Sequence, residues 1–260
     1  MQSCSRSALV LGHPGHELKA YGFLTTFRPV VSVLTDGSGG LGASRLETSR
    51  RLIERVGAKP TSVFGNATDV DIYNAVLHND SDFFLELVAE VADVLSRYQI
   101  EFVAGDACEG YNPTHDLCRE IINAAVERVH LETGRVIQNY AFYLSEWQVT
   151  ASPHLDNCLH FTLNDDLLRE KIRMASRYEE LRDDVSKALG ACGEEFFRVE
   201  CFRPASAGQE PPLQDGMPFY EVRGRERVAE GKYKSVISYQ EHMRPLIRSI
   251  RLHTPVGVAE

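Results

Sequence analysis

Three histidines have the residue type and the spacing of a metal site. His13 and His16 stand three residues apart and directly follow a short apolar run, while His115 follows the loop after a later one. Two imidazoles at a helix start and a third from a neighbouring strand end can bind one zinc ion and leave a position for water. The alternative is that each is an ordinary hydrogen-bonding residue at the start of a helix.

The elements around these histidines alternate between strands and helices. Short apolar runs predict strands at 8–11, 29–34, 62–64 and 101–104, and amphipathic spacing predicts helices at 17–27, 44–56, 80–98 and 113–132. This alternation is typical of an α/β, Rossmann-like fold, a mostly parallel sheet with helices on both faces. All three histidines would then lie at the carboxyl edge of the sheet, where such folds bind ligands.

The second half of the chain is less regular. We expect a strand at 159–162, a charged helix at 165–189, an apolar stretch at 196–202, an exposed loop at 204–218 and a mostly helical tail at 233–250. Because no stretch has the composition of a linker, we predict a single domain over 1–260, with the motifs in about 1–135 and a more divergent part over 136–260.

Composition narrows the classes of partner. The 260 residues carry a formal net charge of −9, which disfavours nucleic acid and anionic membranes as partners and favours a small-molecule substrate. The six cysteines lack the density of a disulfide scaffold, and the first apolar run is too short for a signal peptide or a membrane span. We therefore expect a cytoplasmic protein with reduced thiols, and the sequence leaves room for a homo-oligomer.

A glycine-rich turn offers a competing interpretation. Gly37-Ser-Gly-Gly-Leu-Gly42 fits the spacing of a dinucleotide-binding turn between a strand and a helix. That motif requires an acidic residue at the end of the next strand, and Ser62-Val-Phe-Gly65 ends without one. Dinucleotide binding is therefore the weaker hypothesis.

Taken together, three stretches resemble the LmbE-like (PIG-L) deacetylases, a superfamily that removes acetyl groups from N-acetylglucosaminyl compounds. The family signature A-H-P-D-D-E corresponds to Gly12-His-Pro-Gly-His-Glu17, T-x-G-x-x-G to Thr35-Asp-Gly-Ser-Gly-Gly40, and H-P-D-H to Asn112-Pro-Thr-His115. Order, spacing and strand context agree over about the first 135 residues.

The resemblance implies a zinc ion held by His13, His16 and His115, although another divalent transition metal could take its place. His16 stands where the family has an aspartate ligand, so the set becomes three neutral imidazoles. Such a set lowers the pKa of zinc-bound water to about 7 in another zinc enzyme.

Two further positions depart from the family pattern. Gly15 occupies the position of the family's general base, and glycine cannot accept a proton. Asn112 occupies the position of the first histidine of H-P-D-H; it can donate a hydrogen bond to an oxyanion but cannot act as an acid near neutral pH. The candidate catalytic residues are therefore Asn112 with Glu17 and Asp36 as replacement proton acceptors, and Asp106 and Glu109 are alternatives. Each carboxylate could equally be a loop or capping group.

Other residues are candidates for substrate binding. By resemblance Arg45 would anchor a polar group of the substrate, and Tyr111 would line the pocket; both could instead be ordinary surface residues. His154, His160 and His242 are further candidates for a missing acid.

These observations predict a zinc-dependent hydrolase of the deacetylase type that acts on an N-acyl amino sugar or a related small amide. A metal-binding scaffold of the same fold without that activity is the first alternative, and a dinucleotide-binding enzyme that uses residues 37–42 is the second.

Overall fold

A seven-stranded sheet in the order β3-β2-β1-β4-β5-β7-β6 forms the centre of the part of the chain described by the computed structural model, residues 6–39, 42–144, 158–205 and 208–253. The strands are β1 (Ser7–Leu11), β2 (Val30–Thr35), β3 (Lys59–Ala67), β4 (Phe102–Asp106), β5 (Gln138–Phe142), β6 (Leu159–Thr162) and β7 (Val199–Pro204). β1 to β5 are parallel, and β7 runs antiparallel to both of its neighbours. The predicted fold class is confirmed.

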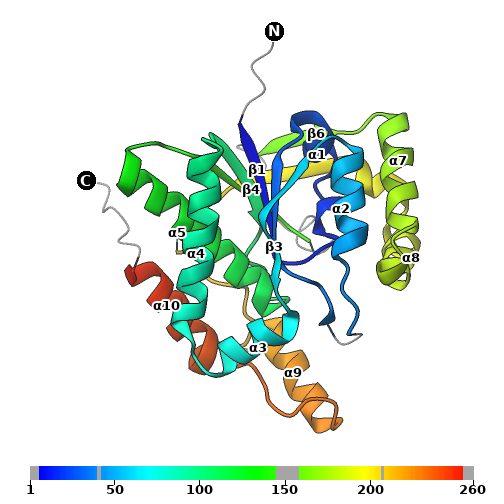
Figure 1. Ribbon diagram of the computed structural model, residues 1–260. Helices are drawn as coiled ribbons and strands as arrows, with labels where there is room; N and C mark the ends of the chain where they lie inside the picture. Colours follow the sequence, from blue (N-terminus) through cyan, green and yellow to red (C-terminus); the bar gives the residue numbers. More distant parts are fainter. Residues whose placement is uncertain (1–5, 40–41, 145–157, 206–207, 254–260) are drawn as a thin grey trace.

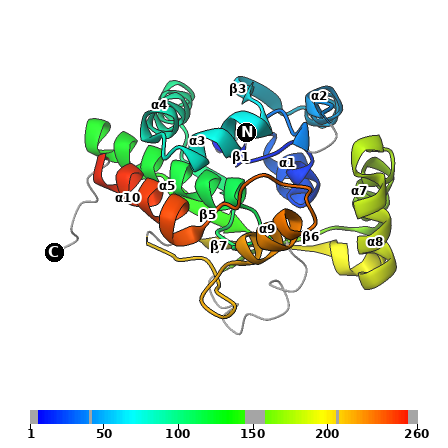
Figure 2. The ribbon, with the colours of Figure 1, turned by 90° about the horizontal axis from the view of Figure 1, so that it is seen from below.

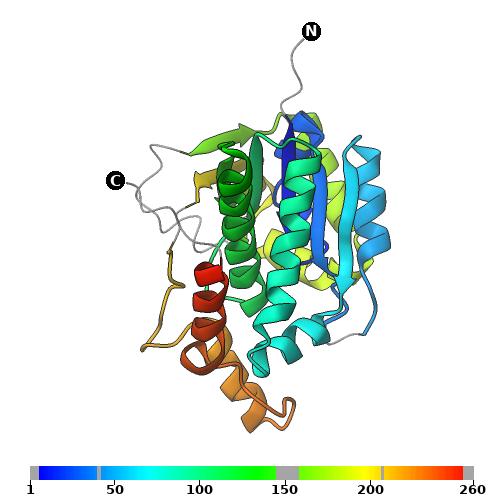
Figure 3. The ribbon, with the colours of Figure 1, turned by 60° about the vertical axis from the view of Figure 1, so that its left-hand side comes forward.

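Helices cover both faces of the sheet (Figure 1). They are α1 (Tyr21–Phe27), α2 (Leu46–Arg55), α3 (Asp69–Leu77), α4 (Ser81–Arg97), α5 (Pro113–Thr133), α7 (Asp165–Ser176), α8 (Arg182–Cys192), α9 (Phe219–Ala229) and α10 (Arg244–His253). On one face α4 and α5 lie side by side with α10 next to them (Figure 3), and on the other lie α1, α2 and α7.

Alternation along β1 explains the two layers. Ala8 and Val10 belong to the apolar cluster that includes α4, α5 and α10, whereas Leu9 and Leu11 belong to the cluster that includes α1 and α2. Every residue of β1 is buried, as expected for a central parallel strand covered on both sides. Within the described residues, no helix has the length and apolar composition needed to cross a bilayer.

Several predicted elements are confirmed within a few residues at each end. These are the strands β1, β2, β4 and β6 and the helices α2, α4 and α5. Asp80, expected at the start of the helix at 80–98, accepts a hydrogen bond from the amide of Phe83 and caps α4. Five of the six cysteines are described, and these are thiols.

Other elements differ from the sequence prediction. The helix expected at 17–27 is a 3₁₀ turn, His16–Leu18, followed by α1, because Ala20 between them has a non-helical backbone with φ −113° and ψ 30°. The charged helix expected at 165–189 is two helices, α7 and α8, separated at the buried Tyr178. α3, α9 and β5 were not predicted, and the strand expected at 62–64 runs from Lys59 to Ala67.

Candidate functional site

The order in which successive strands are added to the sheet reverses between β1 and β4, and the three histidines lie at that point. β2 and β3 follow on one side of this pair and β5 on the other, so the loops after β1 and β4 diverge at the carboxyl edge, which is where open α/β sheets bind ligands. His13 and His16 follow β1, and His115 lies in the first turn of α5, after β4. The sequence prediction that strand ends bring them together is therefore supported by the topology.

The three imidazole rings lie next to one another in edge-on arrangements. The ring centroid of His13 lies 5.3 Å from that of His16 and 5.3 Å from that of His115, and the centroids of His16 and His115 are 4.7 Å apart. Three imidazoles bound to one tetrahedral ion through nitrogens about 2 Å away have centroids about 5 Å apart. The observed spacing matches this arrangement.

A carboxylate lies behind each histidine. Nδ1 of His13 is 3.0 Å from Oδ1 of Asp69 and 2.8 Å from Oγ1 of Thr35, and Nδ1 of His16 is 2.8 Å from Oδ2 of Asp106. These contacts leave Nε2 of both rings as the atom that can bind a ligand. Such carboxylate partners fix the tautomer and the ring orientation of metal-binding histidines.

The third ring has a looser partner. Nδ1 of His115 lies 3.8 Å from Oε1 of Glu109, which is an ion-pair distance rather than a hydrogen bond. Glu109 and Asp106 are both buried; Asp106 ends β4, and Glu109 lies in the loop between β4 and α5. One short segment therefore supplies the carboxylates behind two of the three histidines.

Burial keeps two of these imidazoles neutral. Desolvation lowers the pKa of His16 well below its usual value, and the neighbouring His13 adds to this effect. Desolvation also lowers the pKa of His115 to about 4, against the opposing influence of Glu109. Neutral imidazole is the form that binds a metal ion, so both side chains are in the required state near neutral pH.

The residues present fit a divalent metal ion. Nε2 of His13 is buried and has no protein partner, which is costly unless a ligand or water satisfies it. Three imidazole nitrogens suit zinc and similar transition metals, and the buried carboxylates nearby supply compensating negative charge.

Asn112 and Tyr111 lie at the edge of the histidine cluster. Asn112 caps α5 by accepting a hydrogen bond from the amide of Thr114 at 2.8 Å, so its Nδ2 is the group left to donate. Tyr111 is 47% exposed, and its ring stacks on Phe219 at 5.1 Å and lies 6.4 Å from the ring of His115. The tyrosine therefore lies beside the histidine cluster, and its contact with a substrate stays a prediction.

Helix α9 approaches the same edge of the sheet (Figure 2). The amide of Tyr220 donates to the carbonyl of Gly110, and Phe219 at the start of the helix stacks on Tyr111. The sequence pattern did not predict α9, which adds to the surroundings of the site.

Arg45 bends over the turn after β2. Its Nε donates to the carbonyl of Gly37 at 2.7 Å, and a side chain at Gly37 would collide with the guanidinium. Its charge contributes to the lowered pKa of His16, which places the guanidinium near the cluster.

Glu17 and Asp36, the predicted proton acceptors, both bond to loop backbone. Oε2 of the buried Glu17 accepts the amide of Gly15 at 2.7 Å, and desolvation raises the pKa of Glu17. Oδ1 of Asp36 accepts the amide and the hydroxyl of Ser38 at 3.0 and 2.7 Å. Both carboxylates therefore also shape the loops that surround the histidines.

Asp69 is a site residue that the sequence analysis missed. β3 itself has no acidic residue, as expected, but it extends to Ala67, and Asp69 stands two residues beyond it, at the start of α3. Its carboxylate faces His13 and accepts the amide of Gly39 at 2.6 Å. Asp69 therefore supports the histidine cluster, and Gly40 and Leu41 of the turn lie outside the described residues.

The remaining candidate histidines have other surroundings. Nδ1 of His242 accepts the amide of Ser238 in the turn before α10, and His160 lies on β6 beside Cys158 and Cys201. His154 lies outside the described residues.

Solved structures share this fold, although no protein-family model and no curated protein sequence matches the chain. A deacetylase triple mutant from the teicoplanin biosynthetic pathway has a TM-score of 0.50 at 12% identity and covers 79% of this chain and 100% of its own. The A40926 pseudoaglycone deacetylase Dbv21 has a TM-score of 0.50 at 11% identity, with the same coverage. The conserved protein TT1542 from Thermus thermophilus has a TM-score of 0.52 at 15% identity and covers 81% of this chain and 97% of its own.

Identities this low establish the fold alone. These neighbours belong to the superfamily that the motifs at 12–17, 35–40 and 112–115 resemble. The chain therefore has the fold of the LmbE-like (PIG-L) deacetylase superfamily.

Proposed function

We propose that the protein is a metal-dependent hydrolase of the deacetylase type that cleaves an N-acyl amino sugar or a related small amide. The observation that carries the proposal is the convergence of His13, His16 and His115 at the point where the strand order reverses. A buried carboxylate lies next to Nδ1 of each of these histidines. Deacetylases with the same fold support the reaction class.

In this proposal the three histidines hold zinc or a similar divalent ion. When bound, such an ion supplies a Lewis acid and makes water nucleophilic near neutral pH. Nδ2 of Asn112 donates a hydrogen bond to the oxygen of the amide as negative charge develops there. Arg45 and Tyr111 orient the polar substrate beside the histidine cluster.

Glu17 and Asp36 remain the predictions for the proton acceptor. The variants Glu17→Gln and Asp36→Asn separate them, because each removes the basic oxygen and keeps the size of the side chain. Loss of turnover with metal content retained would identify the acceptor, and retained turnover in both variants would exclude the two residues from that role.

The proposal is tested by release of free amine from a panel of N-acetyl sugars by the zinc-loaded protein. We expect turnover in the wild type, none in His115→Ala, and wild-type turnover in His130→Ala, a matched control because His130 is an exposed histidine on the same helix. An Asn112→Ala variant should lose about 100-fold or more in kcat, as other enzymes do on losing one oxyanion donor.

Each outcome bears on a different hypothesis. Metal lost together with turnover in His115→Ala would support the hydrolase. Metal bound at the histidines without turnover of any amide would favour the non-catalytic scaffold. Dinucleotide binding by metal-free protein would favour the nucleotide-dependent alternative.

A further inference from the structure

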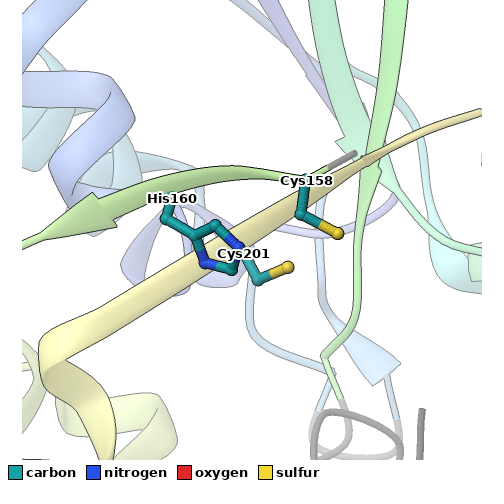
Figure 4. Close-up of side chains that lie close together, drawn as sticks. All are labelled: Cys158, His160 and Cys201. Carbon is teal, nitrogen blue, oxygen red and sulfur yellow. The ribbon is translucent and has the colours of Figure 1, made fainter. Parts of the chain in front are cut away.

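A second group of metal-binding side chains lies at the opposite end of the sheet from β3. Cys158 directly precedes β6, His160 lies on β6, and Cys201 lies on the adjacent antiparallel strand β7 (Figure 4). One ligand atom from each residue lies within 4.8 Å of the other two. The function proposed above uses none of these residues.

The pairing of the two strands places the three side chains on one face. His160 is the direct cross-strand partner of Cys201, and Cys158 stands two residues before His160, which puts it on the same side as His160 in an extended chain. The two neighbouring phenylalanines, Phe161 and Phe202, pack against Phe23 in the core. The cysteines and the histidine therefore project away from the core.

The chemistry of the group suits a thiophilic ion. Two thiols and an imidazole form the Cys₂His set that zinc uses in proteins. Cys158 and Cys201 are half-buried and His160 is exposed, so an ion can enter from solvent.

We propose that Cys158, His160 and Cys201 form a second metal site, which binds zinc or a similar thiophilic divalent ion through two thiolates and one imidazole. Because His160 is exposed, a solvent water can supply the fourth ligand. This site is separate from the three histidines, because β5 and β7 stand between β4 and β6 in the sheet.

The expected consequence of this site is structural. Among the described residues, β6 is the last strand of the sheet and pairs with β7 alone over four residues, so it has little backbone pairing to hold it. An ion shared by both strands would join them at the cross-strand pair His160 and Cys201. We therefore expect metal to slow hydrogen exchange of the backbone amides at 159–162.

The test is a cobalt(II) titration of the full chain under reducing conditions, followed by near-ultraviolet absorption. Only a site with thiolate ligands gives a sulfur-to-cobalt charge-transfer band, so the three-histidine site contributes none. We expect the band in the wild type and its loss in Cys201→Ser, while the variant still binds cobalt at the histidines. Cys192→Ser is the matched control, because Cys192 is a half-buried cysteine in α8 and should leave the band unchanged.

A second variant keeps the proposal testable if Cys201→Ser does not fold. His160→Gln changes an exposed position and should weaken cobalt binding at this site about tenfold or more, because losing a ligand costs at least as much as losing an outer partner of one. Absence of the band in the wild type, or its persistence in Cys201→Ser, would overturn the proposal. Neither outcome would affect the hydrolase, whose own test depends on His115.

Discussion

At the scale of single residues, the histidine cluster combines neutral ligands with charged neighbours. The resemblance to the LmbE-like deacetylases implies an aspartate ligand where this chain has His16. The negative charge that a histidine lacks at this position is supplied by the carboxylate that contacts His16. Asp106 is fully buried and contacts both Nδ1 of His16 and the amide of Gly12. This arrangement makes Asp106 the residue that positions His16.

We expect Asp106→Asn to weaken metal binding at the histidines about 10-fold to 100-fold, the usual cost of altering a carboxylate behind a metal-binding histidine. The amide keeps the size of the side chain but carries no charge. Competition with a chelator of known affinity measures the effect, and Asp93→Asn on the exposed surface of α4 is the control. Unchanged affinity in Asp106→Asn would show that the contact does not tune the site.

Gly15, at the position of the family's general base, has a physical reason to be glycine. Its φ is 105°, and a Cβ there would lie 2.4 Å from Cδ1 of Leu181, so this chain has filled the space that a side chain would need. An aspartate at this position would therefore require Leu181 to move and the backbone to keep a strained conformation.

We expect Gly15→Asp to lower the free energy of unfolding by about 1–3 kcal/mol or more through backbone strain and the collision with Leu181. Gly134→Asp separates the two causes, because Gly134 has a φ of 70° and nothing within 4 Å of its Cβ position. Adding Leu181→Ala should recover part of the loss in the Gly15 variant and none in the Gly134 variant. If urea unfolding showed equal losses of unfolding free energy in both aspartate variants, the collision with Leu181 would not contribute to the destabilisation.

At the scale of elements, one buried ion pair ties the second half of the chain to the helix beside the site. Glu200 on β7 accepts the amides of Gly22 and Phe23 in the first turn of α1 and the ammonium group of Lys171 from α7 at 2.8 Å. Both side chains of the pair are at most 6% exposed. The carboxylate thus joins three elements and satisfies backbone donors at the start of a helix.

We expect Glu200→Ala to lower the free energy of unfolding by about 3–5 kcal/mol, because it leaves Lys171 charged and buried without its partner. A Lys171→Met, Glu200→Leu double variant should recover much of that loss, since it removes both charges. Glu195→Ala, which breaks an exposed ion pair with Arg198, should change little. Equal stability of the wild type and Glu200→Ala in urea would refute the role of the pair.

At the scale of the whole molecule, the sequence predicted the parallel core and the positions of the three histidines, because buried strands are continuous apolar runs and their ends converge. It missed Asp69 because β3 is an edge strand, in which Gly65 and the polar Asn66 interrupt the apolar run and conceal where the strand ends. It could not predict the pair Lys171 and Glu200, because contacts between distant elements depend on how those elements pack. The grouping of Cys158 with Cys201 likewise depends on the register between β6 and β7.

The central claim is that the fold brings three histidines together to hold one metal ion. The most direct measurement is elemental analysis of zinc in the purified wild type, His16→Ala and His130→Ala, prepared side by side. We expect His16→Ala to contain one zinc per chain fewer than the wild type, while the exposed-histidine control matches the wild type. Equal zinc in wild type and His16→Ala, or a wild type without zinc after zinc loading, would contradict it.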